Sequence, residues 1–270
     1  NGPFTHIDQF FTEFIGLEKL KNAIKEIYAT KMVNEKRKQI GLSCKPQVLH
    51  MLFTGNPGTG KTTVARKLAQ FYGEHNLLSK GHFIEAERAD LVGEYIGQTA
   101  QKTRSMLEKA RGGILFIDEA YSLARGGEKD FGKEAIDTLV THMENHHQDF
   151  VLILAGYPEE MRHFLSLNPG LKSRFPFQIE FPDFTVQELM MIAKQMVAKR
   201  EYQLTKDAEQ QLKAFLTFEK RKAVKHFANG RYVRNIIEEA IRRHALRVCS
   251  YEALSAEVLM YLMVEDFKFQ

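Results

Sequence analysis

The sequence predicts an α/β domain with a parallel five-stranded sheet, followed by a small all-α domain. Short apolar runs alternate with helix-like segments through residues 48–181, and no strand-like run follows Pro182-Asp183. Strands that alternate with helices form right-handed βαβ units, in which helices cover both faces of a parallel sheet. We therefore place the two domains at residues 1–183 and 184–270.

The individual elements follow from apolar periodicity and from the glycines that interrupt it. Residues 17–40 show helical spacing and stop at Gly41. The expected strands are 48–55, 82–87, 113–118, 150–156 and 177–181, and the expected helices between them are 61–75, 99–110 and 132–147. In the second domain we expect helices at 185–200, 205–219, 231–248 and 255–264, and no strand.

The composition is that of an ordinary globular protein, with 44% hydrophobic and 27% charged residues, which excludes a disordered chain. A formal net charge of +4 is too small to indicate a nucleic-acid partner by itself. Cys44 and Cys249 have no metal-ligand spacing, so we expect free thiols in a reducing compartment. No apolar run reaches the roughly 18–20 residues that span a bilayer, and no signal peptide is visible. We expect a cytoplasmic protein without a membrane partner.

The stretch GNPGTGKT (55–62) matches the phosphate-loop pattern G-x-x-x-x-G-K-[ST]. Its glycines let backbone N–H groups converge on phosphate oxygens at the positive end of the following helix. Lys61 would reach the β- and γ-phosphates, and the Thr62 hydroxyl would hold Mg²⁺. A glycine-rich turn that binds nothing is the alternative, but the pattern stands between an expected strand and an expected helix, as the mechanism requires.

A second acidic motif strengthens this interpretation. ILFIDEA (114–120) is an apolar run that ends in Asp118 and Glu119, at the strand edge where open α/β sheets bind ligands. Asp118 would help to hold Mg²⁺, and Glu119 would orient or deprotonate the attacking water. A solvated acidic strand end is the alternative. No guanine-reading motif is evident, so ATP is the expected nucleotide.

Further stretches come in the order seen in AAA+ ATPases: FIGLEKLK (14–21), DLVGEYIGQT (90–99), ILFIDEAYSL (114–123), NPGLKSRFP (168–176) and GRYVRN (230–235). With the phosphate loop they resemble the branch of that family that contains red-type Rubisco activases and the stage V sporulation ATPases. The resemblance covers nearly the whole chain, and residues 81–104 and 118–140 look most like the sporulation members. It implies a P-loop AAA+ domain with a helical lid, a ring of subunits (a hexamer), and a bacterial cytoplasmic setting.

The resemblance also implies roles for particular residues. Nucleotide contacts would come from Ile15, Gly16 and Leu17 at the adenine and ribose, and from Asn56, Pro57, Gly58, Thr59, Gly60, Lys61, Thr62 and Thr63 at the phosphates. Arg174 would be an arginine finger supplied to the neighbouring subunit, unless it is a surface arginine that closes a loop. Arg231 or Arg234 would be the lid arginine that senses the γ-phosphate; Arg231 is preferred by position. Residues 14–17 could also form a helix start with an apolar staple, and both roles can hold together.

One departure from the family pattern concerns the end of the fourth strand. Many relatives carry an asparagine or threonine there that contacts the γ-phosphate, whereas this chain has Gly156 and Tyr157.

The stretch GEYIGQT (93–99) places an aromatic and an aliphatic residue between glycines, which favour turns. In a ring ATPase this loop lines the central channel, so Tyr95, Ile96 and Gly97 would grip an extended peptide. A tyrosine packed under a neighbouring element is the alternative. RGGEKDFGK (125–133) would form a second, charged channel loop or an ordinary solvated loop.

Four functions are compatible with these motifs to different degrees. The first is an ATP-driven ring that remodels a protein substrate, of a kind found in sporulation. The second is a Rubisco-activase-type remodeller, which shares nearly every motif. A nucleic-acid-directed AAA+ ATPase is disfavoured by the mild charge and the aromatic loop. A nucleotide-switched scaffold is disfavoured by the intact set Lys61, Asp118, Glu119 and Arg174.

Overall fold

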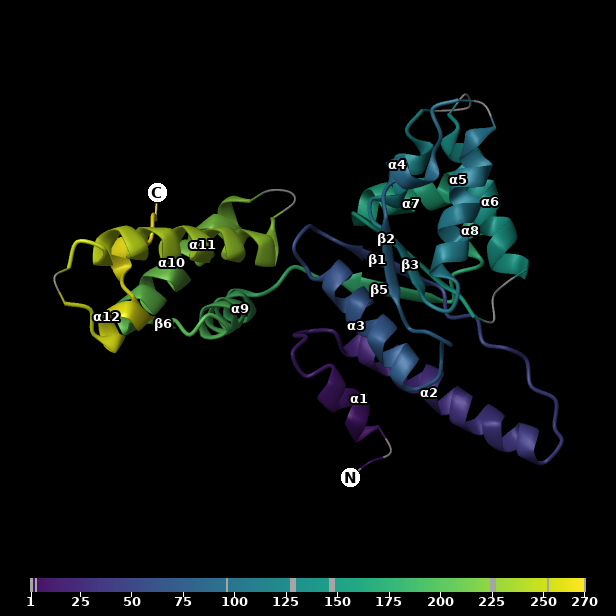
Figure 1. Cartoon of the computed structure of the whole chain (residues 1–270), viewed down its shortest axis with the longest axis horizontal. Helices are drawn as coiled ribbons and strands as arrows, with labels where there is room; N and C mark the ends of the chain where they lie inside the picture. Colours follow the sequence, from purple (N-terminus) through teal and green to yellow (C-terminus); the bar gives the residue numbers. More distant parts are fainter. Residues whose placement is uncertain are drawn as a thin grey trace. The chain divides into compact units, whose positions relative to one another are not determined.

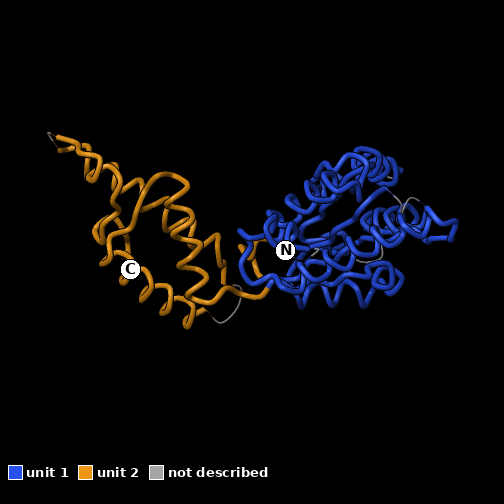
Figure 2. The backbone as a smooth tube through the Cα atoms, turned by 90° about the horizontal axis from the view of Figure 1, so that it is seen from below, with its two compact units in different colours: residues 1–55, 61–181 blue, residues 56–60, 182–270 orange. Residues whose placement is uncertain are grey.

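The computed structural model describes residues 2, 4–95, 97–126, 130–145, 149–223, 227–251 and 253–269. Its contacts divide the chain into two compact units (Figure 2). Unit 1 consists of Asn1–Gly55 and Lys61–Phe181, and unit 2 consists of Asn56–Gly60 and Pro182–Gln270. Residues 56–60 of the phosphate loop therefore group with unit 2, although the residues before and after them in the sequence belong to unit 1.

Unit 1 is built on a five-stranded parallel sheet, as predicted. The strands are β1 (Met51–Gly55), β2 (Phe83–Ala86), β3 (Ile114–Ile117), β4 (Val151–Gly156) and β5 (Phe177–Phe181), in the order β2-β3-β4-β1-β5. β3 and β4 are buried along their whole length, as expected for central strands of a sheet covered on both faces.

Alternate residues of the central strands face two different cores, because successive side chains of a strand point to opposite faces. Phe53 and Phe116 lie in one core with α1 (Thr5–Phe10), α2 (Glu18–Gln39) and α3 (Lys61–Glu74). Leu52 and Leu115 lie in the other core. The elements on that face are α4 (Arg88–Leu91), α5 (Gln98–Ala110), η1 (Ala120–Ala124), α6 (Gly132–Asn145), α7 (Pro158–Leu167) and α8 (Pro169–Lys172) (Figure 1).

Unit 2 is mostly helical, as predicted. Its helices are α9 (Val186–Ala198), α10 (Lys206–Lys222), α11 (Asn229–Val248), α12 (Ala256–Met260) and the short η3 (Val264–Asp266). Thr185 and Thr205 cap α9 and α10, since each hydroxyl accepts a hydrogen bond from a first-turn amide.

The expectation of no strand in this unit is wrong. β6 (Gln203–Leu204) and β7 (Tyr261–Leu262) form a parallel pair, and for this reason the helix expected at 255–264 ends at Met260. Among the described residues, no helix combines the length and the apolar character that crossing a membrane requires.

Candidate nucleotide-binding and hydrolysis site

The phosphate loop joins the carboxyl end of β1 to the first residue of α3, as its motif predicts. Gly58 and Gly60 have φ values of +71° and +95°, a region that side chains with a Cβ rarely adopt. The Thr59 hydroxyl donates to the Asn56 carbonyl at 2.8 Å. Lys61 is buried, and its ammonium donates to the Gly55 carbonyl at 2.7 Å, which holds the cation at the end of the strand.

Asp118 and Glu119 lie at the carboxyl end of β3, the same edge of the parallel sheet as the end of β1. Asp118 Oδ1 accepts a hydrogen bond from the Glu119 amide at 2.9 Å. Glu119 has φ +47° and ψ +48°, a left-handed conformation that costs about 1–3 kcal/mol at a non-glycine residue. Such strain is typical of functional positions, and the surrounding structure has to sustain it.

Aromatic and charged side chains surround Glu119, and the sequence analysis assigned none of them a role at this carboxylate. Arg125 Nη2 lies 3.4 Å from Glu119 Oε2 and its guanidinium stacks over the Tyr121 ring. The Tyr121 and Tyr157 rings are 6.1 Å apart. Burial, followed by the negative charge of Glu119, raises the pKa of Tyr121, so this phenol is protonated at neutral pH and can donate a hydrogen bond.

The residues predicted to lie near the adenine form the start of α2. Leu17 is buried in the core and Ile15 is half-buried. Gly16, between them, has φ +72°. The alternative of an apolar helix start therefore describes what these residues do in the fold, and nucleotide contact by them stays a prediction.

The lid arginines differ in their surroundings within unit 2. A Cβ on Gly58 would lie 2.7 Å from the Arg231 amide and 2.0 Å from the Ala228 carbonyl, and the Gly230 amide donates to the Gly58 carbonyl at 2.9 Å. Arg231 therefore lies in the first turn of α11, the helix against which the phosphate loop packs. Arg234 instead lines a groove between α9 and α11, with Ile192, Gln195, Met196, Lys199, Arg200, Ile237 and Glu238.

Asn229, which the sequence analysis missed, ties the phosphate loop to the segment that leads into unit 2. It is fully buried and has φ +46°. Its amide donates to Asp183 Oδ1 at 2.7 Å and to the Phe227 carbonyl at 2.8 Å, and its carbonyl accepts from the Phe184 amide at 2.9 Å. The Asn56 amide donates to the same Asp183 carboxylate at 3.0 Å, so Asp183 bridges the loop and α11.

Arg174 follows α8, and its side chain is held by contacts within its own chain. Its guanidinium pairs with Glu144 of α6 and donates to the Gly170 carbonyl. The side chain is only partly exposed. An arginine finger for a neighbouring subunit would have to exchange these contacts for the neighbour's phosphate.

The predicted channel loop begins where α4 ends. Tyr95 is 68% exposed, which excludes the alternative of a tyrosine packed under a neighbouring element. Gly97 is exposed, has φ +84° and precedes the first residue of α5. Ile96 lies outside the described residues, as do residues 127–129 of the second predicted loop.

The donor set fits ATP and Mg²⁺ by its chemistry. A loop of two left-handed glycines with a buried lysine at the start of a helix supplies N–H groups and a cation to phosphates. The Thr62 hydroxyl and the Asp118 carboxylate are the oxygen ligands that Mg²⁺ prefers. Across the described part of the chain no group of three or more His, Cys, Asp or Glu side chains could hold a metal ion by itself.

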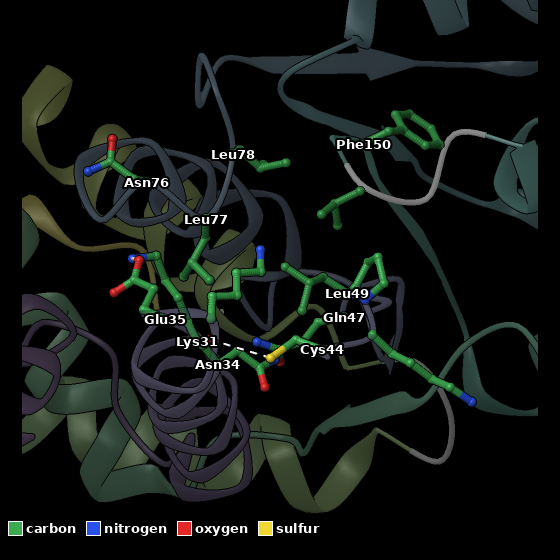
Figure 3. Close-up of a pocket in the computed structure, with 14 residues that line it drawn as sticks. Lys31, Asn34, Glu35, Cys44, Gln47, Leu49, Asn76, Leu77, Leu78 and Phe150 are labelled. Carbon is green, nitrogen blue, oxygen red and sulfur yellow. Dashed lines mark hydrogen bonds and ion pairs between the residues drawn. The ribbon is translucent and has the colours of Figure 1, made fainter. Parts of the chain in front are cut away.

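A separate hollow of about 300 Å³ lies on unit 1, and none of the predicted nucleotide-site residues lines it (Figure 3). Figure 3 shows Lys31, Asn34 and Glu35 of α2 together with Cys44 and Gln47 of the following loop, with Cys44 beside Asn34. The Lys31 ammonium pairs with Glu35, and the Cys44 thiol donates to the Asn34 carbonyl at 3.4 Å.

Comparison with protein-family models gives two matches, one for each part of the chain. Residues 51–183 match the ATPase family associated with various cellular activities (AAA), and residues 185–270 match the AAA lid domain.

Three curated relatives span most of the chain. Stage V sporulation protein K of Bacillus subtilis is 58% identical and covers 98% of this chain and 83% of its own length. The chloroplastic ribulose bisphosphate carboxylase/oxygenase activase of Cyanidioschyzon merolae is 48% identical, and the match covers 90% of this chain and 82% of the relative's length. Protein CbbX of Cereibacter sphaeroides is 44% identical, and the match covers 97% of this chain and 85% of the relative's length. The predicted resemblance is thereby confirmed.

Solved structures agree at the level of the fold. The FIGL-1 AAA domain in complex with ADP has a TM-score of 0.62 at 19% identity and covers 95% of this chain and 81% of its own. A Thermotoga maritima RuvB mutant has a TM-score of 0.58 at 21% identity, with 92% and 70% covered.

Proposed function

This chain is an ATPase of the AAA family, and from that premise we propose that it works as a hexameric ring that remodels a protein substrate. The observation that carries the proposal is Tyr95, an aromatic side chain exposed for 68% of its surface on a loop whose base is fixed to α5. A large aromatic side chain held in solvent is suited to gripping an extended peptide by packing, without reading its sequence.

The proposed division of labour at the nucleotide follows from the site. Backbone amides of residues 56–60 and the Lys61 ammonium bind the phosphates, and Glu119 takes a proton from the attacking water or orients it. Thr62 and Asp118 would hold Mg²⁺, which when bound neutralises charge on the phosphate oxygens. Arg174 of one subunit stabilises the transferring phosphoryl group in the next subunit, so that hydrolysis requires assembly, and Arg231 senses the γ-phosphate from the lid.

The substrate is proposed to be a bacterial protein that acts in sporulation, in the cytoplasm, on the strength of the similarity to stage V sporulation protein K. A metabolic enzyme is the second candidate, because the name of the Cyanidioschyzon merolae relative identifies an activase of ribulose bisphosphate carboxylase/oxygenase.

The test measures ATPase rate per subunit against protein concentration, for the wild type, Arg174→Ala and Glu119→Gln. We expect a steep rise with concentration in the wild type and a loss of about 10³–10⁵-fold in Arg174→Ala, the range found for arginine fingers. Glu119→Gln should bind ATP, hydrolyse it slowly and accumulate as a ring in a sizing run. A wild-type rate that is independent of concentration and of Arg174, in a protein that sizes as a monomer, would refute the ring.

A further inference from the structure

Arg88 and Asp130 form an ion pair that joins two segments 42 residues apart in sequence. Arg88 is the first residue of α4, which begins two positions after the last residue of β2. Its Nη1 donates to Asp130 Oδ2 at 2.9 Å, and its Nη2 pairs with Oδ1. The Asp130 side chain is only 4% exposed. A two-pronged guanidinium–carboxylate contact with one buried partner fixes geometry more firmly than a surface ion pair does.

Backbone amides complete the coordination of this carboxylate. The Gly126 amide donates to Oδ2 at 2.8 Å and the Gly132 amide donates to Oδ1 at 2.9 Å, so each oxygen accepts two hydrogen bonds. The hydrogen bond from Arg88 lowers the pKa of Asp130 to about 2, and the Gly132 and Gly126 amides act in the same direction. Burial of the carboxyl group opposes this shift. The carboxylate is thus charged at neutral pH, and it fixes both described ends of the loop between η1 and α6.

The same arginine also holds the backbone that follows Glu119. Arg88 Nη1 donates to the Ser122 carbonyl at 2.6 Å, and the Ser122 amide donates to the Glu119 carbonyl at 2.8 Å. Arg125, next to the pinned Gly126, reaches the Glu119 carboxylate at 3.4 Å. A closed circuit of contacts therefore runs from the Glu119 backbone through Ser122, Arg88 and Asp130 to Arg125 and back to the Glu119 side chain.

The α4 helix connects this circuit to the base of the Tyr95 loop. The Thr103 hydroxyl donates to the Leu91 carbonyl at 2.9 Å, and Lys102 donates to the Ala89 carbonyl at 2.6 Å. The Gly93 amide donates to the Thr99 hydroxyl at 3.0 Å. The residues that precede Tyr95 are thus tied to α5, while the first residue of α4 is tied to the segment after Glu119.

We propose that Arg88 and Asp130 are positioning residues for ATP hydrolysis, which hold the backbone of η1 and the Arg125 side chain around Glu119 and link them to the base of the Tyr95 loop. This inference rests on the proposed role of Glu119 in handling the attacking water. The strained conformation of Glu119 makes outside support necessary, and a small displacement of a group that handles water can cost about 100-fold in rate.

Arg88→Lys tests the proposal with the charge retained. The single ammonium still neutralises Asp130, but it cannot reproduce the planar fork and the bond to Ser122 together. Arg111→Lys is the matched control, because Arg111 is an exposed arginine whose carboxylate partner, Glu108, lies 4.0 Å away. We expect kcat for ATP to fall about 10–100-fold in Arg88→Lys, with the Kd for a fluorescent ATP analogue within about twofold of wild type. Arg111→Lys should behave as wild type.

A double-mutant cycle with Glu119→Gln separates positioning from a general effect on the fold. If Arg88 acts through Glu119, Arg88→Lys should cause no further loss of single-turnover rate in the Glu119→Gln background. Losses that multiply, or a wild-type kcat in Arg88→Lys, would overturn the proposal. Arg125→Gln, at a largely exposed side chain, should show the same non-additive loss and keeps the test decisive if Arg88→Lys fails to fold. Rapid turnover by Glu119→Gln alone would instead refute the assigned role of Glu119, and this inference with it.

Discussion

Replacement of Asp130 by asparagine should destabilise unit 1 by an amount that shrinks as the pH falls. The pKa of Asp130 is about 2 in the folded chain, against an ordinary value of 3.8. Because the folded-state pKa is the lower one, the stability that this group contributes is present above pH ~4 and is lost as the pH falls toward 2. The shift corresponds to about 2 kcal/mol in total, of which about 1 kcal/mol is gone by pH 3.

The assay is urea unfolding of the nucleotide-free protein at several pH values between 7 and 3. The chain has no tryptophan, so helix content by circular dichroism is the appropriate signal. The quantity of interest is the difference in unfolding free energy between wild type and Asp130→Asn, because other carboxylates that titrate in this range affect both proteins equally. We expect this difference to be about 1 kcal/mol smaller at pH 3 than at pH 7.

Asp8→Asn is the matched control. Asp8 pairs with Lys25 at 2.7 Å, but its side chain is half exposed, so water screens the interaction and its contribution is about 0–1 kcal/mol. The difference between wild type and Asp8→Asn should stay small at every pH. A pH-independent difference for Asp130→Asn, or one that grows in acid, would show that the ion pair with Arg88 does not stabilise the charged form of Asp130.

Two further predictions concern the substrate loop and the phosphate loop. Tyr95→Ala should retain ATP binding and basal hydrolysis but lose remodelling. The measurement is the stimulation of ATPase activity by a trapped substrate, and full stimulation in the variant would exclude Tyr95 as the gripping residue. Asn229→Ala should lower the unfolding free energy of unit 2 by about 1–3 kcal/mol, because it removes the acceptor of the half-buried Phe184 amide and one donor to Asp183. An unchanged thermal midpoint would contradict this.

The parts of the molecule that the sequence predicts well are those with a contiguous signal. The five strands and the phosphate loop appear where apolar runs and glycines place them, and Asp118 and Glu119 follow a buried strand. Two-residue strands such as Gln203–Leu204 carry no periodic signal, so β6 and β7 could not be predicted. α7 could have been found, because Pro158 at its first turn is a recognised helix-start signal.

The interactions that surround the site were missed for a different reason. Arg88, Asp130 and Glu144 look like solvated charges when each is read in its own stretch of sequence, and the role predicted for Arg174 says nothing about its partner Glu144. Only the folded chain brings the members of each pair together, and periodicity says nothing about contacts between segments 30 to 42 residues apart.

The end of β4 shows how packing decides the identity of a residue at a functional position. A Cβ on Gly156 would lie 2.6 Å from the Tyr121 ring and 2.9 Å from Met161, so any larger residue there must displace Tyr121. Tyr121 in turn lies beside Glu119, whose charge contributes to its raised pKa. Glycine at position 156 therefore makes room for a protonated phenol next to the carboxylate. Where many AAA+ ATPases place a polar side chain at the end of β4, this chain therefore has glycine with two phenols beside it: Tyr157 at the next position and Tyr121, whose ring lies 6.1 Å from the Tyr157 ring.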